Sequence, residues 1–317
     1  MSIAGASRDR RSAAALLTAH LARETAQLRK QEARVRADRP DAVHKMRVAA
    51  RKLRSALASY RPLIAPAVAA PIREDLQWLG QTLGRPRDAQ VLRARLRALT
   101  SSEPVELLLG PVIDRIETDL CAEYRAGQEE VLRALRSDRY LRLLDALDDL
   151  VEPFGLLPAA AVPAEELVPR LLRRDAKRLR RAVRSSRVAE PGCRDGALHQ
   201  VRKKAKRLRY SAESAVPVYG RQARALATRA QKIQQVLGEH QDAVVAQHTL
   251  REYGIQAHLG GENAFTFGRL HAREQARAVK AERRFDAAWR DLRRRPVRRW
   301  LDGPRRARGR PARSDFR

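Results

Sequence analysis

Apolar residues recur at helical spacing along nearly the whole chain, and no segment alternates between apolar and polar residues as a strand would. Prolines, glycines and capping residues divide this pattern into segments. Pro40 and Asp41, for example, end one helix and begin the next, with Asp41 expected as the N-cap. The expected helices span residues 8–37, 41–60, 72–83, 88–99, 105–124, 128–150, 165–187, 197–216, 222–237, 242–253 and 262–294. The pattern predicts an all-α protein.

The helical pattern is interrupted most clearly by the segment FGLLPAAAVP, which ends at Pro163. We expect residues 1–152 and 164–295 to form two helical halves, joined by a proline-rich linker over residues 153–163. Residues 296–317 are rich in Arg, Pro and Gly and are expected to form a disordered basic tail. This tail is either simply solvated or a nonspecific hook for anions.

Charge sets this sequence apart from an ordinary helical protein. Among 317 residues, 66 are Lys or Arg and 37 are Asp or Glu, which leaves a formal net charge of +29. Such an excess points to a polyanionic partner, because a partner of opposite charge offsets the self-repulsion. No uncharged apolar stretch is long enough to span a membrane, so a membrane is not expected as a partner. Cys121 and Cys193 lack metal-ligand spacing and suit a reducing cytoplasm.

Two short sequence blocks occur twice with nearly the same separation. HKMRVAARKLR begins at His44 and HQVRKKAKRLR begins at His199, an offset of 155 residues. Downstream, LGRPRDA begins at Leu83 and LGEHQDA at Leu237, an offset of 154 residues. Because two blocks keep their spacing, we interpret the chain as two copies of one structural unit.

In each copy the His, Arg and Lys residues fall on one face of a helix. Offsets of 0, 3, 7 and 10 residues lie within an arc of about 80° and climb about 15 Å along the axis. An apolar stripe lies about 100° around the same helix and would anchor it to a core. Like charges at this spacing repel one another, so an anion is a natural ligand. Two other interpretations stay open: a solvated charged face, and histidines at the core edge that bind a carboxylate.

The LG blocks suggest a structural role first. We expect Gly84 and Gly238 in the left-handed conformation that ends a helix, and Asp88 and Asp242 in the first turn of the next. The alternative is that each Asp pairs with an Arg of the nearby basic stripe.

The segments HKMRVAARKLRSAL and LHQVRKKAKRLRYSAE, each followed by an LGxxxDA block, resemble the conserved histidine α-helical domain (CHAD) family. The resemblance implies an all-α fold of two four-helix-bundle-like halves related by pseudo-twofold symmetry. It implies a basic central cavity or groove that binds inorganic polyphosphate, and association with polyphosphate granules. The ligand-facing residues would be His44, Arg47, Arg51, Arg54, His199, Arg202, Lys206 and Arg209. Four flanking cations that the helical period turns elsewhere are weaker candidates: Lys45, Lys52, Lys203 and Arg207. Arg85 and Arg87 stand where the second copy has Glu239 and Gln241, which questions strict equivalence of the halves.

Catalytic signatures are missing from the sequence. It has no P-loop, His-Glu-x-x-His or Gly-x-Ser-x-Gly motif, and His240 with Asp242 is too small a set for a metal site. We therefore expect polyphosphate binding without catalysis, metal or cofactor. The alternative is sequence-nonspecific nucleic-acid binding, which the scarcity of aromatic residues disfavours. The sequence does not indicate an oligomeric state.

Overall fold

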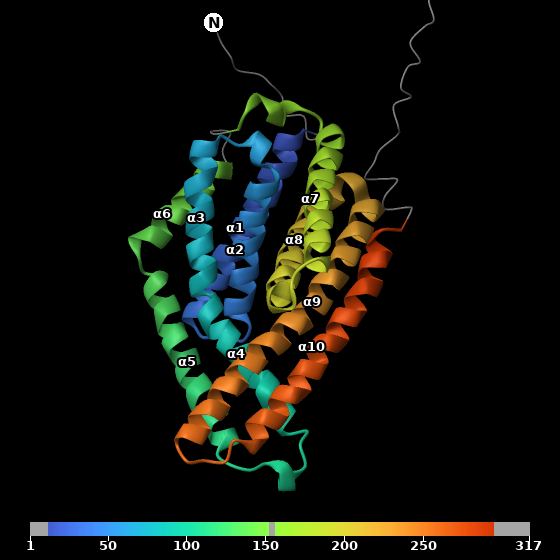
Figure 1. Cartoon of the computed structure of the whole chain (residues 1–317). Helices are drawn as coiled ribbons and strands as arrows, with labels where there is room; N and C mark the ends of the chain where they lie inside the picture. Colours follow the sequence, from blue (N-terminus) through green and yellow to red (C-terminus); the bar gives the residue numbers. More distant parts are fainter. Residues whose placement is uncertain (1–11, 152–155, 295–317) are drawn as a thin grey trace, which may run out of the picture.

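The computed structural model describes residues 12–151 and 156–294, and within these ranges regular structure is helical apart from two isolated β-bridges. The predicted tail, residues 296–317, lies outside the described residues. Ten α-helices follow one another in the described chain (Figure 1). They are α1 Ala13–Arg36, α2 Ala42–Ser59, α3 Pro66–Thr82, α4 Gly84–Thr100, α5 Val112–Ala134, α6 Asp138–Val151, α7 Ala164–Arg187, α8 Arg194–Ser214, α9 Val216–Leu259 and α10 Phe265–Leu292. The predicted all-α fold is confirmed.

Local sequence explains several helix ends. Ser12 caps α1, because its hydroxyl accepts a hydrogen bond from the amide of Ala15 at 3.1 Å. Asp41 precedes α2 as expected, but its side chain makes no capping bond and its φ is +59°. The expected N-cap role of Asp41 is therefore wrong. The α2 helix begins instead from a left-handed residue, a conformation that Asp tolerates better than most.

The structure moves several predicted boundaries, including the starts of α3 and α5, and removes another. Gly127 lies inside α5, which ends only at Ala134. An added Cβ at Gly127 would lie 2.8 Å from Pro86 of α4. Gly127 is thus a close-packing position and not a helix stop. The helices expected over 222–237 and 242–253 form one helix, α9, with a kink at Gly220.

Pro86 explains why the equivalent region of the first copy is broken. It lacks the amide hydrogen that would bond one turn back, and the chain leaves regular helix at Leu83, between α3 and α4. The second copy has His240 at the aligned position, and α9 runs on without interruption.

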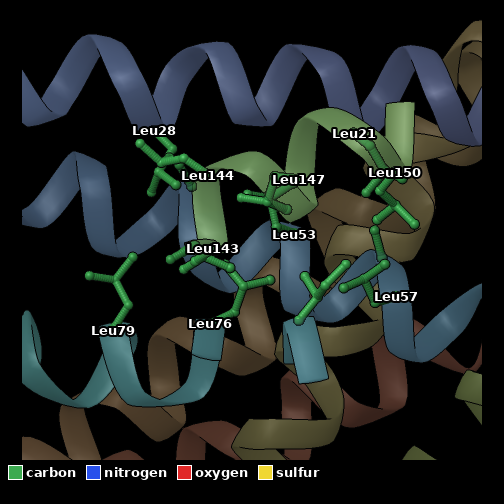
Figure 2. Packing of buried hydrophobic residues seen from close by; sticks show 14 of the residues in the cluster. Leu21, Leu28, Leu53, Leu57, Leu76, Leu79, Leu143, Leu144, Leu147 and Leu150 are labelled. Carbon is green, nitrogen blue, oxygen red and sulfur yellow. The ribbon is translucent and has the colours of Figure 1, made fainter. Parts of the chain in front are cut away.

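Two helical cores correspond to the two halves of the sequence. The first core takes its leucines from α1, α2, α3 and α6, as Figure 2 shows. The second is built from α7, α8, the first part of α9 and the last part of α10. Each is a four-helix arrangement stabilised by burial of apolar surface at about 25 cal/mol per Å².

A third core joins the two halves. It contains Leu96 and Leu99 of α4, residues of α5, and Leu250, Phe267 and Leu270 of α9 and α10. In Figure 1, α9 and α10 lie side by side and run down to α4 and α5. The long helices α9 and α10 of the second half therefore pack with α4 and α5 of the first half. The two halves share this third core and are not two separate bundles.

The predicted linker is packed against the helices where it is described. The amide of Leu157 donates to the carbonyl of Leu63 at 2.8 Å, and the amide of Ala13 donates to that of Val162 at 2.9 Å. Ala160 is buried in the first core. Residues 156–163 thus connect the halves as an ordered strap.

Candidate anion-binding site

The two basic stripes lie on α2 and α8, and these helices pack against each other. Buried apolar residues anchor each one, among them Met46 and Leu53 on α2 and Val201 and Leu208 on α8. Since the basic stripes lie beside the apolar ones, packing of the helices turns both sets of cations toward a shared space.

Three adjoining cavities occupy this space. The first, about 350 Å³ in volume, opens toward α4 and α9, and it is lined by His44, Arg47, Arg51, Arg87, Asp88, Arg95, His199, Arg202, Lys206, Gln241 and Asp242, with apolar neighbours. The second, about 660 Å³, opens toward α3, and its charged and aromatic lining is Arg47, Arg51, Arg54, Arg73, Glu74, His199, Arg202, Lys203, Lys206, Arg207 and Tyr210. A third, about 590 Å³, shares Arg47, Arg51, Arg54 and Lys203 with the second. Cations outnumber carboxylates throughout this interface, which we call the basic cavity.

The cations from the two helices are close enough to repel one another. The pKa of Lys206 is lowered from 10.5 to about 6, first by burial and then by the positive charges of Arg51, Arg202 and Arg47. Burial likewise lowers the pKa of Arg51, and Arg47 and Arg202 add to the effect. Because the like charges of this cluster repel one another, a negatively charged ligand would stabilise it.

Three polar atoms in the cavity lack partners among the described residues. They are Nε of Arg47, Nε of Arg202 and Nδ1 of His199, all buried without a hydrogen bond. An unsatisfied buried polar group costs about 1–3 kcal/mol. An oxyanion would supply acceptors for the two arginine donors, and so lower this cost.

Both histidines are poised to be neutral in the absence of an anion. The pKa of His44 is lowered by partial burial and then by the charge of Arg87. Burial also lowers the pKa of His199, with Lys203 as the next contribution. A neutral imidazole can still donate one hydrogen bond to a phosphate oxygen.

The LG blocks bring a glycine and a carboxylate to each stripe. Neither Gly84 nor Gly238 has a positive φ, so the expected left-handed role is wrong. A Cβ on Gly84 would lie 3.1 Å from Nη2 of Arg47, and one on Gly238 would lie 3.6 Å from Nε of Arg202. Because glycine has no Cβ, the side chains of Arg47 and Arg202 can lie close to the helix backbone at Gly84 and Gly238.

Asp88 takes the pairing role that the sequence left as an alternative, whereas Asp242 forms no ion pair among the described residues. The Arg47 guanidinium donates to both Asp88 oxygens, at 2.7 and 3.3 Å. Burial raises the pKa of Asp242, an effect that Arg202 opposes and Asp88 reinforces. Both carboxylates line the first cavity, so they place negative charge at its α4 and α9 side.

The structure places most of the predicted residues together but not all. Seven of the eight leading candidates line the cavities: His44, Arg47, Arg51, Arg54, His199, Arg202 and Lys206. Arg209 does not line any of these three. Its Nε donates to Glu213 at 2.6 Å, whereas the first copy has Ala58 four residues after Arg54. A local carboxylate thus binds the Arg209 guanidinium, which does not line these cavities.

The weaker candidates divide evenly. Lys52 faces α1, where it pairs with Glu24 at 3.3 Å, and Lys45 is exposed outside the cavities described above. Lys203 and Arg207 do line the second cavity. Arg207 is held there by the buried carboxylate of Asp175, with Nε 3.0 Å from Oδ1.

Sequence reasoning missed Arg73 of α3 and Arg95 of α4 because they come from other helices. It also missed Tyr210, which lies on α8 but is not one of the cations of the stripe. Arg95 also pairs at 2.5 Å with the buried carboxylate of Glu274. Arg85 and Arg87 had a signal, as the arginines that depart from the second LG block; Arg85 lines the third cavity and Arg87 the first.

Neither a metal cluster nor a membrane span is found where side chains are described. Those residues do not gather three or more His, Cys, Asp or Glu as a metal site would need. The helices of residues 12–151 and 156–294 are each too short or too polar to cross a bilayer.

Comparisons with known proteins agree with this architecture. A family model described as CHAD domain matches residues 19–251. Uncharacterized proteins of two Mycobacterium tuberculosis strains are 38% identical over 262 residues, which are 81% of this chain and 49% of each relative. The chain spans about half the length of these curated relatives.

Solved structures show the same fold at lower identity. PptA from Streptomyces chartreusis matches with a TM-score of 0.74 and 21% identity, covering 88% of this chain and 99% of its own. The CHAD domain from the plant Ricinus communis matches with a TM-score of 0.67 and 24% identity, covering 89% and 91%.

Proposed function

Because this chain belongs to the CHAD domain family, we propose that its basic cavity binds inorganic polyphosphate without catalysing a reaction. The observation that carries the proposal is the meeting of the α2 and α8 stripes across one space, where the charges of Arg51 and Arg202 repel each other and disfavour the protonated form of Lys206. Phosphate oxygens would replace this repulsion with charge-assisted hydrogen bonds, which are roughly twice as strong as neutral ones.

The lining chemistry supports an unsubstituted phosphate chain over nucleic acid. Proteins that bind single strands combine a basic groove with aromatic side chains on which bases stack. The three cavities have only Tyr210 as an aromatic lining residue. A polyphosphate chain needs cations and donors alone.

The contacting groups in this proposal are the seven leading candidates in the cavities together with Lys203 and Arg207. Arg47 would exchange its Asp88 partner for phosphate, at least in part. Arg54 and Arg73 would extend the track toward α3, where burial lowers the pKa of Arg54 and the charge of Arg73 adds to the effect.

Titration with polyphosphate of defined length tests the proposal. The cavity variant Arg47→Gln/Arg51→Gln/Arg202→Gln/Lys206→Gln is compared with Arg136→Gln/Arg181→Gln/Arg224→Gln/Arg251→Gln, which replaces the same number of basic side chains at exposed positions outside the cavities. We expect at least a hundredfold loss for the first and a few-fold loss for the second. Equal losses would show that net charge alone is responsible.

Salt dependence provides an independent measure. By analogy with single-stranded nucleic acid, log K falls against log salt with a slope of about −0.7 per phosphate neutralised. The cavity variant should have a slope about 2.8 smaller in magnitude than the parent, because four cations are removed. A slope unchanged by these substitutions would contradict binding in the cavity.

Two further measurements separate the alternatives. Single-stranded nucleic acid at equal phosphate concentration should fail to displace polyphosphate, and displacement would favour nucleic-acid binding. Incubation with polyphosphate and Mg²⁺ should release no phosphate, since the proposal includes no catalysis.

We also propose that binding recruits the protein to polyphosphate granules. A fluorescent fusion should then concentrate on granules, and the four-residue cavity variant should not, while the matched surface variant should. Granule association that survives loss of the cavity cations would overturn this part of the proposal.

A further inference from the structure

Lys206 lies on α8 where the first and second cavities meet, and it has no carboxylate partner among the described residues. Within the described residues its amine takes part in no hydrogen bond or ion pair, although it lines both the first and the second cavity. Arg47 has Asp88 and Arg207 has Asp175. Lys206 is thus a partly buried amine that faces open space.

The groups around Lys206 are mostly cations, from every helix that faces it. Arg47 and Arg51 approach from α2, and Arg202 and Arg209 from α8. Asp242 on α9 is the carboxylate that interacts with it. From α3, Arg73 and Glu74 line the same cavity.

This environment favours the neutral amine. A positive charge on Lys206 would be partly removed from water and would be repelled by four guanidinium groups. The free-base form follows, in agreement with the pKa of about 6. A neutral lysine amine carries a free electron pair and is a nucleophile at neutral pH.

The same guanidinium groups are suited to hold a phosphate. Arg51 and Arg202 flank Lys206 and carry no carboxylate partner in the described ion pairs, and the Nε–H of Arg202 lacks an acceptor. A small molecule with a phosphate beside an electrophilic carbon would therefore bind with that carbon near the amine.

We propose that Lys206 is a modification site for small acyl phosphates, which would transfer their acyl group to its amine. The Nζ electron pair forms a bond to the acyl carbon, and the bond from that carbon to the bridging oxygen breaks. The oxygen leaves with both electrons as inorganic phosphate, next to Arg51 and Arg202. Nζ then loses one proton to water, and the product is a neutral amide. No oxidant or reductant is involved.

Acylation would reduce polyphosphate binding, so this inference rests on the proposed function of the same cavity. The amide cannot regain the proton that a bound polyanion would favour on Lys206, and the acyl group occupies part of the first cavity. Polyphosphate binding and acylation would thus compete for the same side chain, Lys206.

Acetyl phosphate is the probe, applied to the full chain near pH 7 with peptide mass spectrometry as the readout. We expect Lys206 to be acetylated at least tenfold faster than Lys232, an exposed lysine on α9. Long-chain polyphosphate should protect Lys206 and leave Lys232 unaffected. Modification of Lys206 no faster than of Lys232 would overturn the inference.

The pH profile tests for a neutral amine. The rate at Lys206 should change by less than about twofold from pH 7 to 9. Nα-acetyllysine in the same mixture should react about tenfold faster per pH unit, because an ordinary lysine amine has a pKa near 10.4. A tenfold rise per unit at Lys206 would contradict the inference.

A phosphate-free reagent tests the role of the cavity. N-hydroxysuccinimidyl acetate needs a neutral amine but no anion site. Arg51→Gln should lower the Lys206 rate with acetyl phosphate more than the rate with this reagent, and an unchanged ratio would mean that the phosphate is not held.

Failure of the two proposals can be told apart. If polyphosphate binds but Lys206 resists acetyl phosphate, only the modification site is refuted. If Lys206 is acetylated but polyphosphate neither binds nor protects it, the proposed function is refuted and a site for small acyl phosphates alone is supported.

Discussion

The Asp88 carboxylate accepts hydrogen bonds from both Nη1 and Nη2 of Arg47, at 2.7 and 3.3 Å, inside the first cavity. Asp88 is 69% exposed and Arg47 is 21% exposed, so the pair is open to exchange with a phosphate. Bidentate pairing fixes the guanidinium plane, and it also supplies an internal competitor for any anion.

Asp88→Asn should tighten polyphosphate binding. The substitution frees Arg47 and removes a negative charge from the cavity, so we expect a several-fold lower Kd at low salt. Asp75→Asn is the matched control, because Asp75 pairs with Arg139 outside the cavities. Isothermal titration calorimetry measures the Kd of both variants for polyphosphate. Equal changes in Kd would indicate that only the net charge of the protein matters.

Polyphosphate affinity should fall as pH rises from 7 to 9 because of Lys206. Its pKa is about 6 in the free protein, and a bound polyanion raises it, so binding takes up a proton in this window. One full proton corresponds to about tenfold in Kd per pH unit. Lys206→Arg should be nearly flat over the same range. Long polyphosphate chains at constant ionic strength are used, so that titration of the terminal phosphates contributes little. If log Kd of Lys206→Arg changes with pH as steeply as that of the parent, this assignment is contradicted.

The same lysine should make the ligand-free protein less stable as pH falls. The folded-state pKa is lowered from 10.5 to about 6, so between these values the unfolded chain binds more protons. Stability present at high pH is therefore lost as pH falls toward 6, by at most about 1.4 kcal/mol per unit. Lys206→Met should remove this slope in urea unfolding between pH 7 and 9. A slope that persists in Lys206→Met must come from other groups.

The histidines should act at lower pH than Lys206. The pKa values of His44 and His199 are lowered from 6.5 in the free protein, and a polyanion would raise them. Binding should thus tighten as pH falls below about 6.5, and be tighter at pH 6 than at pH 8. His44→Ala/His199→Ala should lose the acidic part of this dependence. The double variant and the parent binding equally well at pH 6 would count against a role for these side chains.

Gly84 and Gly238 should respond differently to alanine. A Cβ at Gly84 meets Arg47 at 3.1 Å, and one at Gly238 meets Arg202 only at 3.6 Å, an ordinary contact. Gly238→Ala lies inside α9 and should stabilise the protein by about 0.5–1 kcal/mol. Gly84→Ala should gain less stability, and it should change polyphosphate affinity because the added Cβ displaces the Arg47 side chain. Thermal unfolding and titration are measured together, and identical behaviour of the two variants would refute the distinction.

Asp175→Ala should destabilise the protein by about 3–5 kcal/mol. This buried carboxylate accepts from Ser59 at 2.7 Å and Ser211 at 2.8 Å, and it pairs with Arg178 and Arg207. The change leaves partly buried guanidinium groups without a partner. Asp175→Asn keeps acceptors for the serines and should cost less in urea unfolding. Little effect from the alanine variant would mean that solvent replaces the carboxylate.

The repeat, the helices and the composition of both basic stripes were determined by the sequence itself. Helical period fixes the angle between side chains on one helix, so His44, Arg47 and Arg51 had to share a face, as had their partners on α8. The same reasoning could place an apolar stripe beside each basic one. The matching blocks also linked each stripe to a glycine and an aspartate downstream.

The tertiary structure decided what each face meets, because period gives no information on the helix opposite. It joined α4 and α5 to α9 and α10 in a third core, and it brought Arg95 to the cavity. It also showed Arg209 held by Glu213, and Arg207 held within the cavity by Asp175. The protonation of Lys206 belongs to this level too, since burial and the charges of a second helix set its pKa.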